Sequence, residues 1–366
     1  MKSSRSIKIF TGISLATLAI SAISSLAFTT VTASINKIDA FAGIEKRPEK
    51  ISSAVNYLLV GSDTREGLSK AELKELRVGS VATAAGKRSD TMLLVHISKA
   101  RDKAVLISIP RDSFALIPSY TNKAGKVIPA RHSKINSAFN WGGAPLLIQT
   151  IEEMTQLKID HYVEVNFAGF AQVVDALGGI EVCTKKDIDD PKSHLVLAAG
   201  VHTLNGIESL KYVRTREFDG MGDIGRMQRQ QAFMSSVLKK ATSAGVLLNP
   251  ITMTSFINSS LDAVTTDEGL QSAELISLAK GMKSLATSNI RTLTVPLSDL
   301  NYYANGVTAS VLWDPVLAPE LWNRLREDRA VVDEVLPSAS PSSTTAAKVE
   351  VIDKFKTRTA EDNICR

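Results

Sequence analysis

Cysteine and histidine are scarce in this chain, which has two cysteines and five histidines among 366 residues. The histidines are His96, His132, His161, His194 and His202. They lack the spacing of metal ligands, and none falls in a Ser/His/Asp pattern. Two cysteines alone do not make a metal site. The sequence therefore disfavours a zinc enzyme and a serine hydrolase.

Charge of one sign is not concentrated in the chain either. The 43 basic and 38 acidic side chains give a formal net charge of +5 and a pI near 9.0. This excess suits an anionic lipid, phosphate or polymer but does not establish nucleic-acid binding, and no DNA-reading motif is recognisable. We expect no nucleic-acid partner. With 44% hydrophobic residues, the chain has ample material for a globular core.

The N-terminal region carries a long uncharged run from Ile9 to Asn36, which follows three basic residues. The run is long enough to cross a bilayer of about 30 Å. The basic residues place residues 1–8 in the cytoplasm and residues 37–366 outside it. We therefore predict a transmembrane signal-anchor at 9–36 in the cell membrane. A cleaved secretory signal is the alternative, because "VTAS" at 31–34 loosely resembles a cleavage site.

Export changes the meaning of the two cysteines, Cys183 and Cys365. An even count outside the cytoplasm is compatible with one disulfide, which would tie the C-terminal tail to the domain. Two unpaired thiols are the alternative.

The rest of the chain divides by composition. We expect a stalk at 37–54, an extracytoplasmic domain at 55–335, a Ser/Pro/Thr-rich linker at 336–348 and a C-terminal tail at 349–366. No internal repeat is visible.

Strand and helix patterns alternate within the domain. Buried strands are predicted at 56–60, 91–98 and 104–109, and an alternating strand at 161–167. Helical periodicity covers 143–154 and 167–179, and Ser69 with Glu72 matches a capping box for a short helix at 69–76. The expected fold is α/β (α+β), a three-layer α/β/α arrangement with a central mixed sheet, preceded by one transmembrane helix.

Charged residues bound the first three strands. Asp63 follows the first strand, Arg88 and Asp90 precede the second, and Arg111 follows the third. If these strands run antiparallel in order, their charged ends meet at one edge of the sheet. We predict that Asp63 and Asp90 bind Mg²⁺, with Mn²⁺ as the alternative ion. Aspartates that only cap turns are the structural alternative.

The segment "VRTREFDGMGDIGRMQRQQ" (213–231) is dense in arginine. We predict a strand through 212–216, which puts Arg214 and Arg216 on one face, and then a helix capped by Asp223 with Arg226 and Gln230 on one side. Such cations suit an anion. The alternative is a solvated charged face, which is favoured for Arg229. Arginines combined with a few aspartates are what phosphoryl or pyrophosphate chemistry requires.

Taken in order, several segments resemble the successive motifs of the LytR-CpsA-Psr family. They are "GSDTR", "RSDTMLLVHI", "SIPRDS", "HSKINSAFNWGG", "DHYVEVNFAGFAQVVDALGGIEV" and "HTLNGIESLKYVRTRE" with "GDIGRMQRQQ". The resemblance covers the motif core at 55–245. The segment at 180–204 and the cysteine near the C-terminus look most like actinobacterial members.

The resemblance implies a membrane-anchored phosphotransferase. Such enzymes move a glycopolymer from a polyprenyl-pyrophosphate carrier to a peptidoglycan hydroxyl and form a phosphodiester. The donor glycan would be arabinogalactan, a teichoic-acid-like polymer or a capsular polymer. By position, Asp63 and Asp90 resemble the magnesium-associated carboxylates of the family. The residues that resemble its pyrophosphate-binding and catalytic groups are Arg88, Arg111, Arg214, Arg216, Asp223, Arg226 and Gln230. Asp223 either assists deprotonation of the acceptor or only caps a helix.

Two other functions stay open. The first is a non-catalytic envelope protein or regulator that binds polyprenyl-phosphate lipids, which needs the arginines more than Asp63 and Asp90. The second is a pyrophosphatase that acts on the same lipid, with water in place of the sugar hydroxyl.

Overall fold

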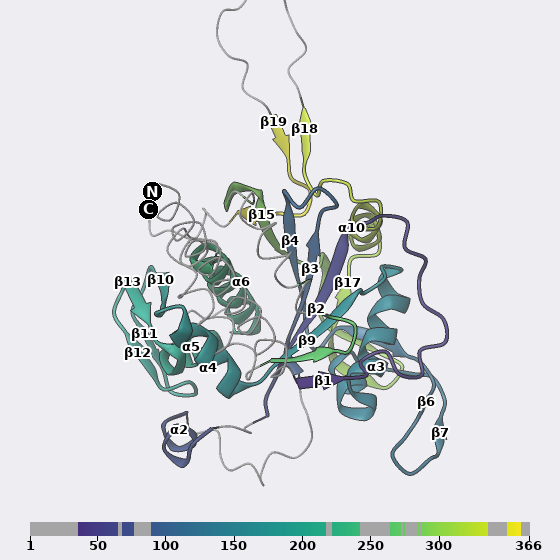
Figure 1. Ribbon diagram of the computed structural model, residues 1–366, viewed down its shortest axis with the longest axis horizontal. Coiled ribbons are helices and arrows are strands. Elements are labelled where there is room, and N and C mark those ends of the chain that lie inside the picture. Colours follow the sequence, from purple (N-terminus) through teal and green to yellow (C-terminus); the bar gives the residue numbers. More distant parts are fainter. Residues whose placement is uncertain are drawn as a thin grey trace, which may run out of the picture.

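The computed structural model describes residues 36–64, 68–76, 89–216, 222–241, 264–271, 287–335 and 350–359, together with Glu274 and Leu285. Its main feature is an eight-stranded sheet with helices on both faces (Figure 1). From one edge to the other, the strands are β1 (Asn36–Ile38), β14 (Val264–Asp267), β9 (His161–Val165), β2 (Val55–Ser62), β3 (Ser89–Ile97), β4 (Ala104–Ile109), β15 (Ile290–Thr294) and β20 (Arg358–Thr359).

Three strands consecutive in the chain form the centre of this sheet. β2 pairs antiparallel with β3, and β3 pairs antiparallel with β4. β9 lies parallel to β2 and β15 lies parallel to β4, so the sheet is mixed. All six residues of β4 are buried, as expected for an apolar strand covered on both faces. The predicted mixed central sheet and the antiparallel order of its first three strands are confirmed.

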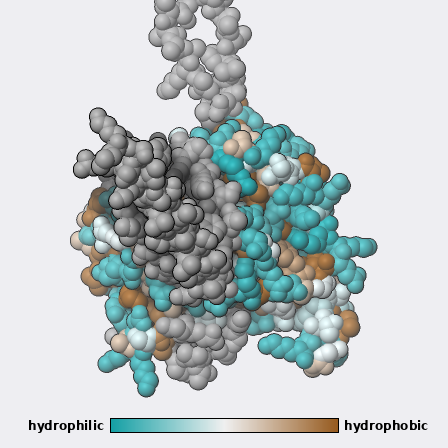
Figure 2. Space-filling view, viewed as in Figure 1, coloured by the Kyte–Doolittle hydropathy of each residue, from teal (hydrophilic) through white to brown (hydrophobic). Residues whose placement is uncertain are grey.

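Helices cover both faces of the sheet. On one face, α3 (Asn136–Thr155) and α10 (Leu317–Arg326) contribute to the largest core cluster. On the other face, α6 (Gly222–Ala241) packs against a separate cluster. Because strand side chains alternate, Leu94 belongs to the first cluster and its neighbour Leu93 to the second. The sheet is therefore the middle of three layers. Where the face in Figure 2 is not grey, hydrophilic residues predominate and hydrophobic ones occur in small groups.

A second, smaller core lies beside α6 and includes its Phe233. It is built from α2 (Lys70–Leu76), α4 (Phe167–Ala176), α5 (Gly206–Arg214) and two antiparallel ribbons, β10 (Ile180–Thr184) with β13 (Gly200–Leu204) and β11 (Ile188–Asp190) with β12 (Leu195–Leu197). α5 approaches α4 closely, since a Cβ on Gly206 would lie 2.3 Å from the carbonyl oxygen of Ala171. Glycine at the first position of α5 is therefore required by packing.

Further two-stranded ribbons surround the sheet. They pair β5 (Phe114–Ile117) with β8 (Arg131–Lys134), β6 (Tyr120–Thr121) with β7 (Val127–Ile128), β16 (Leu297–Ala304) with β17 (Val307–Trp313) and β18 (Asp333–Val335) with β19 (Glu350–Ile352). A short 3₁₀ helix, η3, spans Thr287–Asn289. Residues 350–359 thus return to the domain through β19 and β20, whereas the predicted linker at 336–348 and Cys365 lie outside the described residues.

The predicted helices are present, with local differences. α2 begins with the expected capping box, in which the Ser69 amide donates to Glu72 and the Glu72 amide donates to the Ser69 hydroxyl. α3 begins at Asn136, seven residues before the predicted start, and contains a kink at Gly143 (φ 66°, ψ −153°). Pro145 follows the kink in the first turn of the second half, where its missing N–H leaves no bond unmade.

The predicted strand through 212–216 is wrong. α5 continues to Arg214, and Thr215 is its C-terminal cap. Asn205 and Glu208 form a capping box that starts this helix, and Leu210 and Val213 bury one face of it in the smaller core. The buried spacing of three residues follows the helical period, so Arg214 and Arg216 do not share a strand face.

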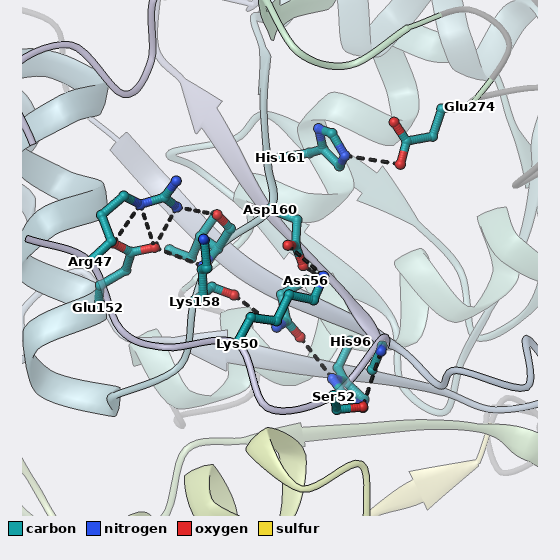
Figure 3. A network of polar contacts seen from close by, with 12 residues as sticks. Arg47, Lys50, Ser52, Asn56, His96, Glu152, Lys158, Asp160, His161 and Glu274 are labelled. Carbon is teal, nitrogen blue, oxygen red and sulfur yellow. Dashed lines mark hydrogen bonds and ion pairs between the residues drawn. The ribbon is translucent and has the colours of Figure 1, made fainter.

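The predicted stalk at 37–54 is not a free segment in the structure. β1 pairs with β14, and Ala40 is buried in the largest core. Figure 3 shows Arg47 bound to Glu152 of α3. Arg47 Nη2 lies 2.6 Å from Glu152 Oε1. The Glu152 carboxylate also accepts from the backbone N–H of Ile159. The buried Glu152 carboxylate needs these donors, and one of them is Arg47 of the predicted stalk. Residues 36–54 therefore belong to the packed domain.

The predicted transmembrane span at 9–36 lies outside the described residues except for Asn36, which begins β1. Of the helices in the described ranges, none has the length and apolarity to cross a membrane.

His161 at the start of β9 bridges two carboxylates. Its Nδ1 lies 3.2 Å from Asp267 Oδ2. Its Nε2 is bonded to Glu274 (Figure 3), with 3.0 Å between Nε2 and Oε1. Burial by itself lowers the pKa of His161, but the hydrogen bond and charge of Asp267 and the charge of Glu274 outweigh it. The pKa of His161 is therefore raised above 6.5.

This raised pKa predicts a pH-dependent stability. The folded chain holds the His161 proton more tightly than the unfolded chain. The contribution of this proton to the free energy of unfolding is therefore complete below about pH 6.5 and is lost as the pH rises through the pKa of His161 in the folded chain. We expect His161→Gln to lower the free energy of unfolding more at about pH 5.5 than at about pH 8.5, as measured by urea denaturation. Equal losses at the two pH values would contradict this role.

Candidate active site

The charged ends of three strands meet at one edge of the sheet. Gly61 of β2 lies opposite Thr91 of β3, and Met92 lies opposite Ile109 at the end of β4. Asp63 therefore follows β2 beside the start of β3, and Arg111 follows β4 at the same edge. The predicted convergence is confirmed at the level of the backbone.

The register also places Asp90. Ser62 pairs with Ser89 and Gly61 with Thr91, so Asp90 is the extra residue of a β-bulge. Bulges occur often next to active sites, where they interrupt the ladder. The side chain of Asp90 and the whole of Arg88 lie outside the described residues.

A cavity of about 160 Å³ opens at this edge. Its floor includes Thr91 and Met92 of β3, and one wall is the loop that carries Arg111 and Asp112. α6 supplies a second wall with Arg226, Met227 and Gln230, and the β16–β17 ribbon supplies a third with Leu297, Leu300, Ala309 and Val311. The cavity thus joins three predicted site residues, Arg111, Arg226 and Gln230, from segments more than 100 positions apart.

The loop after β4 has a fixed backbone and a positive balance of charge. Asn136 donates its N–H to the Arg111 carbonyl, and Val311 donates its N–H to the Asp112 carbonyl. Asp112 forms an ion pair with Lys134, whose Nζ lies 3.2 Å from Oδ1, and its Oδ2 lies 3.5 Å from Arg111 Nε. One carboxylate is thus shared by two cations, and the buried Arg226 adds a third positive group nearby. The cavity suits an anionic group.

Further contacts fix α6 against its neighbours. Gln231 Nε2 donates to Ser108 Oγ at 3.1 Å and to Thr294 Oγ1 at 2.7 Å, which joins α6 to β4 and β15. Arg229 donates to the carbonyl of Thr215, and Gln230 Nε2 donates to the carbonyl of Val213 at 3.2 Å. The last carbonyls of α5 have no partner within their own helix, so these bonds satisfy them. The predicted solvated face for Arg229 is wrong, since the residue is buried.

Arg214 and Arg216 do not line the cavity. The Arg214 guanidinium lies 5.4 Å from the centroid of the Phe167 ring. Phe167 follows β9, whose Val165 pairs with Gly61, so Arg214 lies at the same edge of the sheet near the end of β2. The backbone N–H of Arg216 donates to Asp190 Oδ2 at 2.6 Å, which fixes the chain just after α5.

The aspartates fit a divalent cation in donor chemistry and in backbone placement. Asp63 is half-buried after β2, and Asp90 lies on the neighbouring strand. Carboxylate oxygens are the donors that Mg²⁺ prefers. The residues that the structure describes contain no group of three or more His, Cys, Asp or Glu side chains suited to a metal ion.

Sequence reasoning missed several residues that shape the site. Asp112 and Lys134 form an ion pair beside Arg111, and Gln231 and Arg229 position α6. The first pair was visible in "PRD" and "HSK", but only the β5–β8 ribbon brings the two segments together. Most of the apolar residues of α3 are buried in the largest core.

Comparison with known proteins gives related sequences and folds. The chain is 36% identical over 292 residues to the probable cell wall biosynthesis protein LcpB of Corynebacterium glutamicum. This match covers 80% of this chain and 65% of LcpB. It is 36% identical over 202 residues to the polyisoprenyl-teichoic acid–peptidoglycan teichoic acid transferase TagT of Bacillus subtilis. That match covers 54% of this chain and 55% of TagT. The chain thus spans about half to two thirds of the length of these curated relatives.

Solved structures share the fold. TagT bound to LIIa-WTA superposes with a TM-score of 0.57 at 27% identity and covers 79% of this chain and 98% of that one. A LytR-Csp2A-Psr enzyme from Actinomyces oris superposes with a TM-score of 0.58 at 20% identity and covers 80% and 95%. Residues 23–326 match the LytR_cpsA_psr family, which is more than half of the chain. The chain therefore belongs to the LytR_cpsA_psr family.

Proposed function

We propose that this protein transfers a glycopolymer from a polyprenyl-pyrophosphate carrier to a hydroxyl of peptidoglycan and forms a phosphodiester. The observation that carries the proposal is the cavity that joins Arg111, Arg226 and Gln230 at the polar edge of the sheet. A pyrophosphate is the kind of dianion that such forked cations recognise. Relatives named as teichoic acid transferases support the same reaction class.

The reaction balances as a phosphoryl transfer. The acceptor hydroxyl oxygen attacks the phosphorus that bears the glycan, and the bond from this phosphorus to the bridging oxygen breaks. Polyprenyl phosphate leaves with the bonding electrons, and the hydroxyl proton passes to a base. Arg111 and Arg226 would stabilise the charge on the phosphate oxygens, and the fixed loop backbone keeps Arg111 in place. Asp223 is our candidate for the base. The predicted N-cap role of Asp223 is wrong, because α6 begins at Gly222 and Asp223 is its second residue.

A divalent ion belongs to this proposal. Asp63 and Asp90 would hold Mg²⁺, or Mn²⁺ in its place. When bound, the ion would neutralise negative charge on the phosphate oxygens. Arg88, Arg214 and Arg216 would contact the pyrophosphate from beside the cavity, and Arg214 would do so from the end of α5.

The cellular setting is also a proposal. The basic residues and the uncharged run at 9–36 support a membrane anchor with the domain outside the cytoplasm. Membrane fractionation should place the full chain in the membrane fraction.

A Cys183–Cys365 disulfide is supported by the absence of a free thiol among the described residues. Thiol labelling of the unfolded chain should find no reactive thiol before reduction, and labelling of two thiols would contradict the bridge.

The test of the function uses the full chain in detergent, because β1 and the segment up to residue 54 are part of the domain. The chain is incubated with a short polyprenyl-pyrophosphate glycan, Mg²⁺ and peptidoglycan fragments, and products are followed by mass spectrometry. We expect a phosphodiester product that needs the metal and is lost in Asp90→Ala. Tight lipid binding without product would favour a carrier-binding protein. Release of glycan phosphate without an acceptor adduct would favour a pyrophosphatase.

A further inference from the structure

The β16–β17 ribbon forms a wall of the cavity that the proposed chemistry does not use. Leu300 of β16 lines the cavity and is 51% exposed. Tyr303, three residues further along, is 59% exposed and is the one exposed Phe, Tyr or Trp side chain in the described part of the chain. An exposed aromatic ring next to a candidate active site needs an explanation, because such rings are enriched at binding surfaces.

A bulge explains why these two side chains are both exposed. Asp299 pairs with Leu312 and Tyr302 pairs with Ser310, so three steps along β16 match two along β17. The extra residue reverses the normal alternation of strand side chains. Leu300 and Tyr303, separated by about 10 Å along an extended strand, therefore both reach the surface.

Aromatic packing supports this surface from one side. The ring of Tyr302 meets Phe114 edge-on at 5.1 Å between centroids, and Phe114 stacks on His132 at 4.9 Å. Asn305 at the tip of the ribbon donates Nδ2–H to His132 Nδ1 at 3.2 Å. His132 and Asn305 are both exposed, so polar groups that can exchange hydrogen bonds with a ligand lie beside the rings.

The ribbon is joined firmly to the arginine loop. Trp313 Nε1 donates to Ser113 Oγ at 2.9 Å, and the backbone N–H of Val311 donates to the carbonyl of Asp112 at 2.8 Å. The Ser310 hydroxyl closes the ribbon by donating to the Tyr302 carbonyl. A ligand on the ribbon would therefore be held at a fixed position relative to Arg111.

The chemistry of the ribbon restricts what can bind. In "LSDLNYYANGVTASVLW" (297–313), Asp299 is the only charged residue. A polyanion would find no cation there, and a lipid chain would meet exposed Asp299, Asn301 and Thr308 among the apolar groups. A neutral, hydroxyl-rich chain fits both the ring and the neutral polar side chains.

We propose that the exposed face of the β16–β17 ribbon, centred on Tyr303, binds the sugar chain of the acceptor. This inference rests on the proposed function. In the proposed reaction the arginines hold the donor through its pyrophosphate, whereas the acceptor reacts through a neutral hydroxyl and needs a surface of its own. A sugar chain seated on Tyr303 passes Leu300 and delivers a hydroxyl to the cavity.

The test compares full-length Tyr303→Ala with Tyr303→Phe, which keeps the ring, and with Val196→Ala, a 77% exposed side chain on β12 outside the cavity. Initial rates are measured against acceptor and donor concentration separately. We expect Tyr303→Ala to raise the KM for the acceptor about tenfold, with an unchanged KM for the donor and an unchanged melting temperature. Tyr303→Phe and Val196→Ala should behave as the wild type.

A second measurement separates this inference from the proposed function. Binding of the full-length proteins to peptidoglycan glycan strands is measured without donor. If the wild type binds and Tyr303→Ala does not, the surface is supported even where no transfer occurs. Normal acceptor KM and normal strand binding in Tyr303→Ala would overturn it. A change confined to the KM for the donor would overturn the proposal in favour of the donor as the ligand of this surface. A change confined to partitioning into lipid vesicles would overturn it in favour of a lipid.

Discussion

Replacing Arg111 with alanine should lower the rate of glycopolymer transfer by about two to three orders of magnitude, which is the usual effect of removing one fixed donor from a developing oxyanion. The side chain lines the cavity and is 25% exposed. Its loss should change the melting temperature little, because Asp112 keeps its ion pair with Lys134. Initial rates and thermal unfolding of the full chain measure the two effects.

Arg329→Ala is the matched control for this variant. Arg329 is 54% exposed, pairs with Glu327 and does not line the cavity. Its replacement should leave both rate and melting temperature close to those of the wild type. If Arg111→Ala unfolds at a much lower temperature and loses activity in proportion, Arg111 has a structural role and the cavity is not the pyrophosphate site.

Replacing Glu152 with alanine should lower the free energy of unfolding by about 3 kcal/mol. This value is near the lower end of the usual cost of removing one partner from a buried ion pair. Glu152 is 2% exposed and binds both Arg47 and the N–H of Ile159. Removing the carboxylate leaves the Ile159 N–H without its acceptor and takes the carboxylate from the Arg47 guanidinium, which keeps its bond to the Ile159 carbonyl. This remaining bond and the 22% exposure of Arg47 limit the cost. Urea denaturation of the full chain measures the change.

Lys50→Ala is the control for the same segment. Lys50 pairs with Asp160 at 2.6 Å, but its side chain is 31% exposed. An exposed pair contributes about 0–1 kcal/mol, so this variant should unfold almost as the wild type does. Equal losses for Glu152→Ala and Lys50→Ala would mean that the segment before β2 does not depend on the buried pair.

Several parts of the site could be predicted because they depend on local patterns. Apolar runs bounded by charge placed Asp63, Asp90 and Arg111 at the ends of three strands, and their antiparallel order brought those ends together. Ser69 with Glu72 identified the start of α2. These predictions held because strand alternation and helix capping act over a few residues and need no distant partner.

Other predictions failed where distant packing decides. The alternation of Tyr212, Arg214 and Arg216 resembled a strand, but burial of α5 against the smaller core extends the helix to Arg214. The segment before β2 looked like a stalk, yet Arg47 meets Glu152 across 105 positions. Tertiary contacts override weak local preference in both cases.

The sequence by itself determined the antiparallel order of three central strands, the chemistry of the polar edge and the family that its motifs resemble. Only the tertiary structure decided that Lys134 neutralises part of Asp112 and that the β16–β17 ribbon closes the cavity beside Arg111. The reason is physical. Periodicity and capping are written in neighbouring residues, whereas a cavity is formed by side chains that become neighbours only when the sheet and its covering layers pack together.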